Sequence, residues 1–216
     1  MLRQRIVIAI FFAVLSSIGL QRSAEGAILF DTFGPDNSYP PSFVLWALGA
    51  EDAWEQGEGF TPPAGSFHLD KIEAAISLAA GPNEVVLSLY DTQSGLPGSV
   101  IEAFAFSGAM GPLGEVNPVL SAQSGLRPIL TGGTQYWLIG SVPDPTLTTA
   151  AWAHSAHTGP HAVRFSGGSW FLRSDLQGAF RIQGTPVGGQ AVIPEPAAFF
   201  GFLFGLVHLA GFKRRP

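Results

Sequence analysis

Three histidines in the C-terminal third of the chain have the residue type that binds transition metals. His154, His157 and His161 are three and four positions apart, a spacing that would place their imidazoles on one side of a helix. The Gly159-Pro160 pair would interrupt a helix there, and the same spacing does not converge on one point in a strand or a loop. We interpret the segment as a loop between two strands, with a metal site as the alternative.

Two Asp-Thr pairs raise the question of an aspartic protease, in which two carboxylates share one proton. Asp31-Thr32 and Asp91-Thr92 are followed by Phe33 and Gln93, where that motif needs a glycine. We therefore interpret both aspartates as turn residues that accept hydrogen bonds from nearby amides. The chain also contains no Gly-x-Ser-x-Gly motif, no His-Glu-x-x-His motif and no phosphate-binding loop.

The composition of the chain excludes further kinds of chemistry. Because none of the 216 residues is cysteine, there can be no disulfide, thiolate zinc site or cysteine nucleophile. Five basic and 14 acidic residues lie between positions 27 and 193, which gives this part a net charge of −9. Nucleic-acid binders neutralise phosphates with clustered lysine and arginine, so we predict no nucleic-acid partner.

Acidic residues in the expected loops supply oxygen ligands of the kind that calcium binds. They are Asp36-Asn37, Asp144, and the run Glu51-Asp52 with Glu55 and Glu58. None of them has the spacing of a calcium-binding loop. Solvated surface charge is therefore the first interpretation, and a bound calcium ion is the alternative.

Trp54 is the residue best suited to contact a ligand. It stands among Glu51, Asp52, Glu55 and Glu58, where burial would remove charged groups from water. An exposed indole beside carboxylates can stack on a sugar ring while the carboxylates bind the sugar hydroxyls. The first interpretation is a loop tryptophan folded back on the edge of the domain. The alternative is an exposed loop in which Trp54 contacts a sugar.

The elements that must position these residues are short strands. Apolar and polar residues alternate along 71–78, residues 84–90 are expected to return as the second strand of a hairpin, and Pro97-Gly98 suits a type II turn that closes it. With 27 glycines and 17 prolines, the chain favours many turns over long helices. We predict an all-β fold, an antiparallel, jelly-roll-like β-sandwich over 28–183. The remaining strands are expected at 28–33, 43–48, 100–106, 127–130, 135–142, 150–153, 162–165, 169–172 and 179–183.

The first 26 residues have the layout of a secretory signal peptide. Two arginines precede an uncharged run over 6–20, and small residues follow at Ala24 and Gly26. The run would form a helix of about 22 Å, which is shorter than the roughly 30 Å core of a bilayer. We predict a signal helix that is cleaved before Ala27 or Ile28, with a retained N-terminal anchor as the alternative.

The C-terminal end combines three further features. After a Gly/Pro linker at 184–193 come Pro194-Glu195-Pro196, an apolar stretch over 197–212, and the basic cluster Lys213-Arg214-Arg215 within 213–216. The apolar stretch would form a helix of about 24 Å, which suits a short transmembrane span with its basic end on the cytoplasmic side. We expect the main domain to face the exterior.

This end, residues 194–216, resembles the PEP-CTERM sorting signal of Gram-negative bacteria. The resemblance implies recognition by an exosortase-type membrane peptidase and transient anchoring in the inner membrane. Removal of the tail would then deliver the protein to the cell surface or extracellular matrix. His208 within the apolar span is a mild departure from the pattern. An ordinary tail anchor is the alternative.

The part between the two ends, about 28–183, resembles a family of bacterial surface domains called choice-of-anchor domains. The resemblance implies a fold and a location but no catalytic residues, cofactor or metal ligands. We expect an exported, non-enzymatic surface protein. A carbohydrate-binding module for the cell's exopolysaccharide and a β-sandwich hydrolase are the alternatives. The segments that carry the resemblance are Leu29-Phe30-Asp31-Thr32-Phe33, Leu87-Ser88-Leu89-Tyr90-Asp91, Gly95-Leu96-Pro97-Gly98, Tyr136-Trp137-Leu138 and Gly178-Ala179-Phe180-Arg181.

Overall fold

The described part of the chain is an all-β structure. The computed structural model describes residues 26–40, 44–49, 54–165 and 167–188. Within these ranges the one helical element is the 3-10 turn η1 (Pro35–Asn37). The strands are β1 (Ala27–Asp31), β2 (Val44–Gly49), β3 (Trp54–Phe60), β4 (Ser66–Ala74), β5 (Ile76–Ala80), β6 (Glu84–Gln93), β7 (Leu96–Ser107), β8 (Leu120–Gln123), β9 (Ile129–Thr131), β10 (Tyr136–Ser141), β11 (Thr149–Phe165), β12 (Phe171–Gly178) and β13 (Phe180–Pro186).

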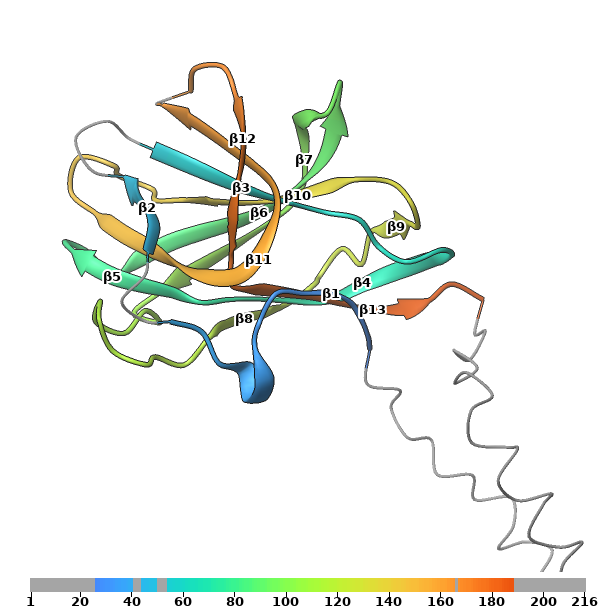
Figure 1. Ribbon diagram of the computed structural model, residues 1–216, viewed down its shortest axis with the longest axis horizontal. Coiled ribbons are helices and arrows are strands. Elements are labelled where there is room, and N and C mark those ends of the chain that lie inside the picture. Colours follow the sequence, from blue (N-terminus) through green and yellow to red (C-terminus); the bar gives the residue numbers. More distant parts are fainter. Residues whose placement is uncertain (1–25, 41–43, 50–53, 166, 189–216) are drawn as a thin grey trace, which may run out of the picture.

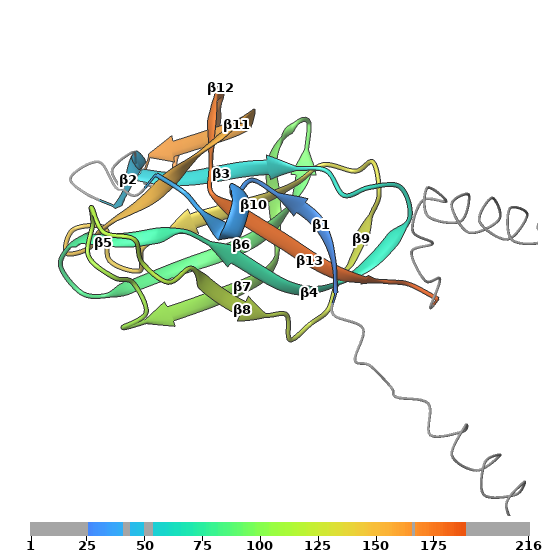
Figure 2. The same ribbon diagram turned by 60° about the horizontal axis from the view of Figure 1, so that its bottom comes forward.

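The strands form two curled antiparallel sheets (Figure 1). In the smaller sheet the order is β1-β13-β4-β8, and β9 also pairs with β4. In the larger sheet the order is β12-β11-β2-β3-β10-β6-β7, and β5 also pairs with β11. Figure 2 shows β13 and β4 running side by side in the smaller sheet. The prediction of an all-β, antiparallel fold is confirmed.

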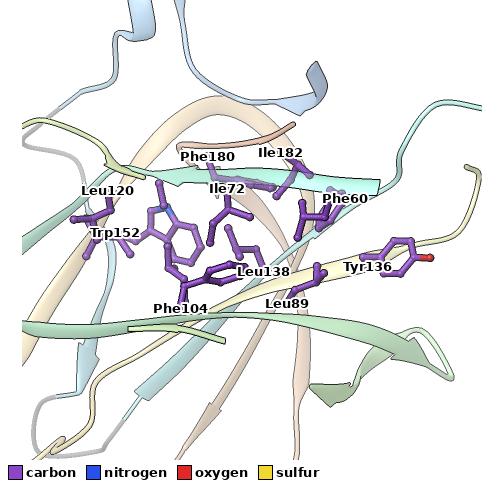
Figure 3. Close-up of a cluster of buried hydrophobic side chains, with 14 of the residues drawn as sticks. Phe60, Ile72, Leu89, Phe104, Leu120, Tyr136, Leu138, Trp152, Phe180 and Ile182 are labelled. Atoms are coloured by element: carbon purple, nitrogen blue, oxygen red, sulfur yellow. The ribbon is translucent and has the colours of Figure 1, made fainter. Parts of the chain in front are cut away.

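One hydrophobic core lies between the two sheets. Because successive side chains of a strand point to opposite faces, a strand such as β13 buries every second residue. In the larger sheet, β3 and β10 are buried on both faces. Figure 3 shows Ile72 and Phe180 of the smaller sheet meeting Leu89 and Phe104 of the larger sheet. Burial of each such side chain contributes about 1.5–3 kcal/mol. This shared core therefore holds the two sheets together.

The alternating segment at 71–78 forms two strands in different sheets rather than one strand. β4 ends at Ala74 and β5 begins at Ile76. Between them, the Ala75 N–H donates to the Ala179 carbonyl over 3.0 Å, and the Ala75 carbonyl accepts from Ala153. β5 then pairs with β11, whereas β6 pairs with β7 and β10. The expected hairpin between 71–78 and 84–90 is therefore wrong.

The turn between β6 and β7 lies earlier than predicted. Its central residues are Ser94 and Gly95, with φ values of 54° and 80°, and the flanking strand residues Gln93 and Leu96 pair directly. Type I′ turns require positive φ at both central positions, because this geometry matches the twist of the strands. Pro97-Gly98 lies within β7 instead, so the predicted type II turn is wrong.

Two segments expected as loops are strands. The segment around Trp54 forms β3, and the three histidines lie inside the 17-residue β11, which joins the strands expected at 150–153 and 162–165. The first half of β11 pairs with β2 and β5, and its second half pairs with β3 and β12. A register shift precedes Gly159-Pro160, and proline is tolerated in sheets near such irregularities.

The two ends of the described region lie together in the smaller sheet. Ala27 at the start of β1 pairs with Gly184 of β13, which continues to Pro186 and so past the expected domain end at Gln183. Apart from Gly26, the predicted signal helix lies outside the described residues, as does the predicted transmembrane helix at 197–212. Within the described ranges, no helix has the length and apolar character that crossing a bilayer requires.

Candidate functional site

A pocket of about 430 Å³ opens beside Trp54. Strand pairing assembles it from distant parts of the chain, because the register places Glu55 of β3 opposite Arg164 of β11. Trp54 lies at the start of β3, opposite Phe165. The described lining consists of Trp54, Glu55, Tyr90, Ser141, Val142, Pro145, Arg164 and Gly167.

An ion pair forms the polar side of this pocket. The Arg164 guanidinium donates a hydrogen bond of 2.7 Å to Oε2 of Glu55. The two side chains are about one-fifth exposed, at 22% and 20%. Arg164 also lies over the Trp170 ring, 4.5 Å from the ring centre, in a cation-π arrangement. Carboxylate and indole together fix the position of the guanidinium.

The arginine keeps its charge in this setting. Burial lowers the pKa of Arg164, but the hydrogen bond and the negative charge of Glu55 outweigh burial, and Tyr90 adds a smaller effect in the same direction. The net result is a pKa raised above the usual value of an arginine. Arg164 is therefore a positively charged hydrogen-bond donor in the pocket wall. The negative charge of Glu55 is balanced by Arg164.

The aromatic side of the pocket rests on a small apolar cluster. Trp137, Ile139 and Ala162 are buried there, and Tyr90 and Trp170 pack against them. A glycine of β3 makes this packing close. Gly57 pairs with both Ile139 and Ala162, and a Cβ atom at Gly57 would lie only 2.5 Å from Cδ1 of Ile139.

Trp54 is half-buried rather than displayed on an exposed loop. Its indole packs against the ring of Phe165, which is itself exposed to solvent. The prediction of a loop at Trp54 is therefore wrong. Trp54 lines the pocket next to one carboxylate, Glu55, while Glu51 and Asp52 lie outside the described residues. Sugar contact by Trp54 stays a prediction.

Glu58 is buried, contrary to the expectation that this acidic run is solvated. It lies in the middle of β3, opposite His161 of β11, and Oε1 of Glu58 is 3.0 Å from Nδ1 of His161. Both side chains are completely inaccessible to solvent. The carboxylate is tolerated inside because strand pairing supplies a hydrogen-bonding histidine at the same level.

The structure does not bring the three histidines together. His161 is buried against Glu58, His154 is half-buried, and His157 is exposed. Across the part of the chain that the structure describes, no three histidine, aspartate or glutamate side chains form a group suited to a metal ion. The interpretation of this segment as a loop is corrected to a strand with one histidine in the core.

The two Asp-Thr pairs lie in different sheets and have separate partners. Asp31 accepts a hydrogen bond of 2.9 Å from the N–H of Phe33 and pairs with Arg181. Asp91 accepts one of 2.6 Å from the N–H of Ser99. Both carboxylates thus accept hydrogen bonds from amides, as expected. Their placement in turns is wrong, because Asp31 ends β1 and Asp91 lies within β6.

The other expected calcium ligands are dispersed over the surface. The side-chain oxygen of Asn37 accepts a hydrogen bond from Arg181. Asp144 accepts hydrogen bonds from the hydroxyl and the N–H of Thr146, and these bonds lower its pKa below the usual value of an aspartate. Asp36 lies in η1, where its φ of 56° belongs to a tight turn.

Sequence reasoning missed Tyr90 and Arg164 as lining residues of this pocket, and Trp170 as the ring beside Arg164. The pairing of β3 with β11 brings in Arg164, and β10, which lies between β3 and β6, brings in Tyr90. Pro194-Glu195-Pro196 and Lys213-Arg214-Arg215 lie outside the described residues. In comparisons with known proteins, no protein-family model matches the chain. No curated protein matches it at a significant level either.

Proposed function

We propose that the chain is an exported, non-enzymatic surface protein whose domain binds a sugar of the extracellular polysaccharide in the Trp54 pocket. The pocket carries the sugar-binding part of the proposal. It sets the rings of Trp54 and Tyr90 beside a fixed carboxylate and guanidinium. Sugar rings have apolar faces that stack on aromatic side chains and hydroxyls that bind charged groups.

The arrangement of carboxylates favours binding over hydrolysis. Glycosidases use two carboxyl groups on either side of the scissile bond. The described lining of the Trp54 pocket holds one carboxylate, Glu55, which is already paired with Arg164. Among these described residues, a bound sugar would therefore meet hydrogen-bonding groups but no pair of carboxyl groups.

Export and sorting complete the proposal and rest on the two ends of the chain. The predicted signal peptide ends where β1 begins, so cleavage before Ala27 leaves every paired residue of the first strand in place. The sorting tail, with its resemblance to PEP-CTERM signals, follows β13 after the linker. We propose that the domain is a jelly-roll-like sandwich of the choice-of-anchor type, processed by an exosortase-type peptidase.

Sugar binding is tested by comparing two aromatic substitutions in the full chain. Trp54→Ala removes the ring that lines the pocket, whereas Phe171→Ala removes a ring from an exposed position of β12 outside the described lining. We expect Trp54→Ala to weaken retention on the exopolysaccharide of the producing bacterium about tenfold, as loss of about 1.4 kcal/mol would. Phe171→Ala should bind as the unchanged protein does. Equal retention of both variants would refute sugar contact by Trp54.

Sorting is tested by replacing Pro194, Glu195 and Pro196 with alanine. We expect the variant to be exported but to remain in the inner membrane with its tail attached. Mass spectrometry of the C-terminus of the surface-delivered protein provides the measurement. Surface protein that still carries Lys213 to Pro216 would show that the tail is an anchor and not a cleaved sorting signal.

A further inference from the structure

A second polar site lies on the outer face of the smaller sheet. It is a cleft of about 930 Å³, and its floor is a row of four residues that are paired from strand to strand. Ile28 pairs with Gln183, Gln183 with Lys71, and Lys71 with Gln123. The row therefore crosses β1, β13, β4 and β8. The full described lining is Gly26, Ile28, Asp70, Lys71, Gln123, Ser124, Arg127, Gln183 and Thr185.

An irregularity in β4 gives this cleft two adjacent charged side chains. Lys71 pairs with Gln183, but Gly184 pairs with Leu69, so Asp70 is an extra residue in the ladder. In a regular strand, neighbouring side chains point to opposite faces. Here Asp70 and Lys71 both line the cleft. Such bulges redirect side chains next to functional sites in many sheets.

A strained turn holds Arg127 at the cleft. Arg127 has a φ of 47°, which residues other than glycine seldom adopt. Its N–H donates to the Ser124 hydroxyl over 2.8 Å, and its carbonyl accepts from Nδ1 of His68. The carboxylate of Glu102 accepts from Ser124 and from the N–H groups of Gly125 and Leu126. These contacts fix a conformation that directs the guanidinium onto Asp70.

The polar groups of the cleft that can still form hydrogen bonds are mainly N–H donors. Oδ1 of Asp70 accepts from Arg127, and Oδ2 accepts from Thr185. Within the described residues, the Arg127 guanidinium uses one nitrogen in this way and its side chain is 52% exposed. Lys71 donates to Glu73 and keeps further N–H groups. A ligand rich in acceptors therefore suits this cleft better than a ligand rich in donors.

The charge around the cleft differs from that of the domain. Between positions 27 and 193 the chain has five basic residues and a net charge of −9, yet two of those five line this cleft. Asp70 pairs with Arg127 and Glu73 pairs with Lys71, so positive and negative charges balance here. Arginine binds carboxylates through parallel hydrogen bonds. The carboxamides of Gln123 and Gln183 can donate hydrogen bonds to hydroxyl groups of a ligand and accept hydrogen bonds from them. Carboxylate and hydroxyl groups occur together in acidic sugars.

We propose that this cleft binds an acidic saccharide, with its carboxylate on Arg127 and Lys71 and its hydroxyls on Gln123 and Gln183. The site is separate from the Trp54 pocket, which lies on the larger sheet. The domain thereby has two carbohydrate sites, one on each sheet. The proposal for this cleft does not depend on sugar contact by Trp54.

The experiment uses isothermal titration calorimetry on the full chain in detergent, with trigalacturonate as the probe and the neutral trisaccharide cellotriose for comparison. Arg127→Gln removes the guanidinium, and Lys71→Gln is a second variant that leaves the strained turn unchanged. Arg173→Gln removes the same charge from an exposed position of β12 and serves as the matched control. Thermal denaturation is used to check that each variant is folded.

We expect trigalacturonate to bind, and its affinity to fall as salt is raised. Arg127→Gln should weaken the affinity about tenfold or more, and Lys71→Gln about threefold, since charge-assisted hydrogen bonds are the strong ones. Arg173→Gln and Trp54→Ala should leave it unchanged. Equal binding of cellotriose, equal binding of an acidic peptide such as triglutamate, or equal losses in Arg127→Gln and Arg173→Gln would overturn the proposal. Loss of trigalacturonate binding in Trp54→Ala alone would place the acidic sugar in the other pocket.

Discussion

Gln56 and Gln177 are both buried in the domain, but their side chains have different environments. Within the described residues, neither polar atom of the Gln56 carboxamide has a hydrogen-bond partner. The Gln177 amide donates to the carbonyl of Gly59 over 2.7 Å. Since a buried polar group without a partner loses its contacts with water and gains none, Gln56 lowers the stability of the domain.

We therefore expect Gln56→Met to stabilise the full chain by about 1–2 kcal/mol, because methionine has nearly the same shape and no polar atom to satisfy. The melting temperature should rise by a few degrees, at roughly 2–4 °C per kcal/mol for a domain of this size. Gln177→Met is the matched control, and it should lower the melting temperature because it removes an existing hydrogen bond. A Gln56→Met variant that melts at or below the unchanged protein would contradict this account.

At the scale of elements, the sequence predicted the strand content but not the strand partners. Alternation along 71–78 predicts Ile72 and Ile76 as buried, and they are, yet they lie in different sheets. Ala75 and Ser77, expected on the opposite face, are buried too. A period of two shows which side chains face inward and carries no information on where a strand changes sheet. The Trp54 pocket shows the same limit of prediction from local sequence. Trp54 and Glu55 are adjacent in sequence and were predicted together, whereas Arg164 joins them through a pairing across 109 positions.

β3 was missed for a related reason. Along Trp54-Glu55-Gln56-Gly57-Glu58, polar residues occupy both faces, so no apolar alternation marks a strand. The strand forms with charged residues in it because β11 supplies partners for both of its carboxylates. Glu55 pairs with Arg164 and Glu58 with His161, both on β11. Strand propensity depends on such cross-strand partners, which a single segment does not reveal.

The β6–β7 hairpin offers a test of its turn. Gly95 has a φ of 80°, and a Cβ atom added there would meet nothing within 4 Å, so only backbone strain opposes a side chain. We expect Gly95→Ala to lower the free energy of unfolding of the full chain by about 1–2 kcal/mol. Gly125→Ala is the control, since an added Cβ there makes one ordinary contact, 3.7 Å from Glu102, and should change stability by less than about 0.5 kcal/mol. Urea unfolding measures both, and equal effects would argue against a left-handed turn at Gly95.

At the scale of the whole molecule, the last strand closes the domain. β13 lies between β1 and β4 in the smaller sheet and contributes Phe180 and Ile182 to the core. The first and last strands are therefore neighbours, and both sheets depend on the same buried side chains. No portion of the described domain that lacks β13 can keep β1 paired in this sheet.

We expect a fragment of residues 26–188 to fold alone and to unfold in one cooperative transition, because it contains both sheets and the described core between them. A fragment that ends at Gly178 should not fold. It loses the buried residues Ala179, Phe180 and Ile182, of which the last two alone contribute about 3–6 kcal/mol, against a total stability of about 5–15 kcal/mol. It also leaves β1 and β4 without their partner. Far-UV circular dichroism and tryptophan fluorescence, followed through thermal unfolding, distinguish the two fragments. A strand-type spectrum with cooperative unfolding in the shorter fragment, or a strongly helical spectrum in the longer one, would show that β13 does not complete the fold.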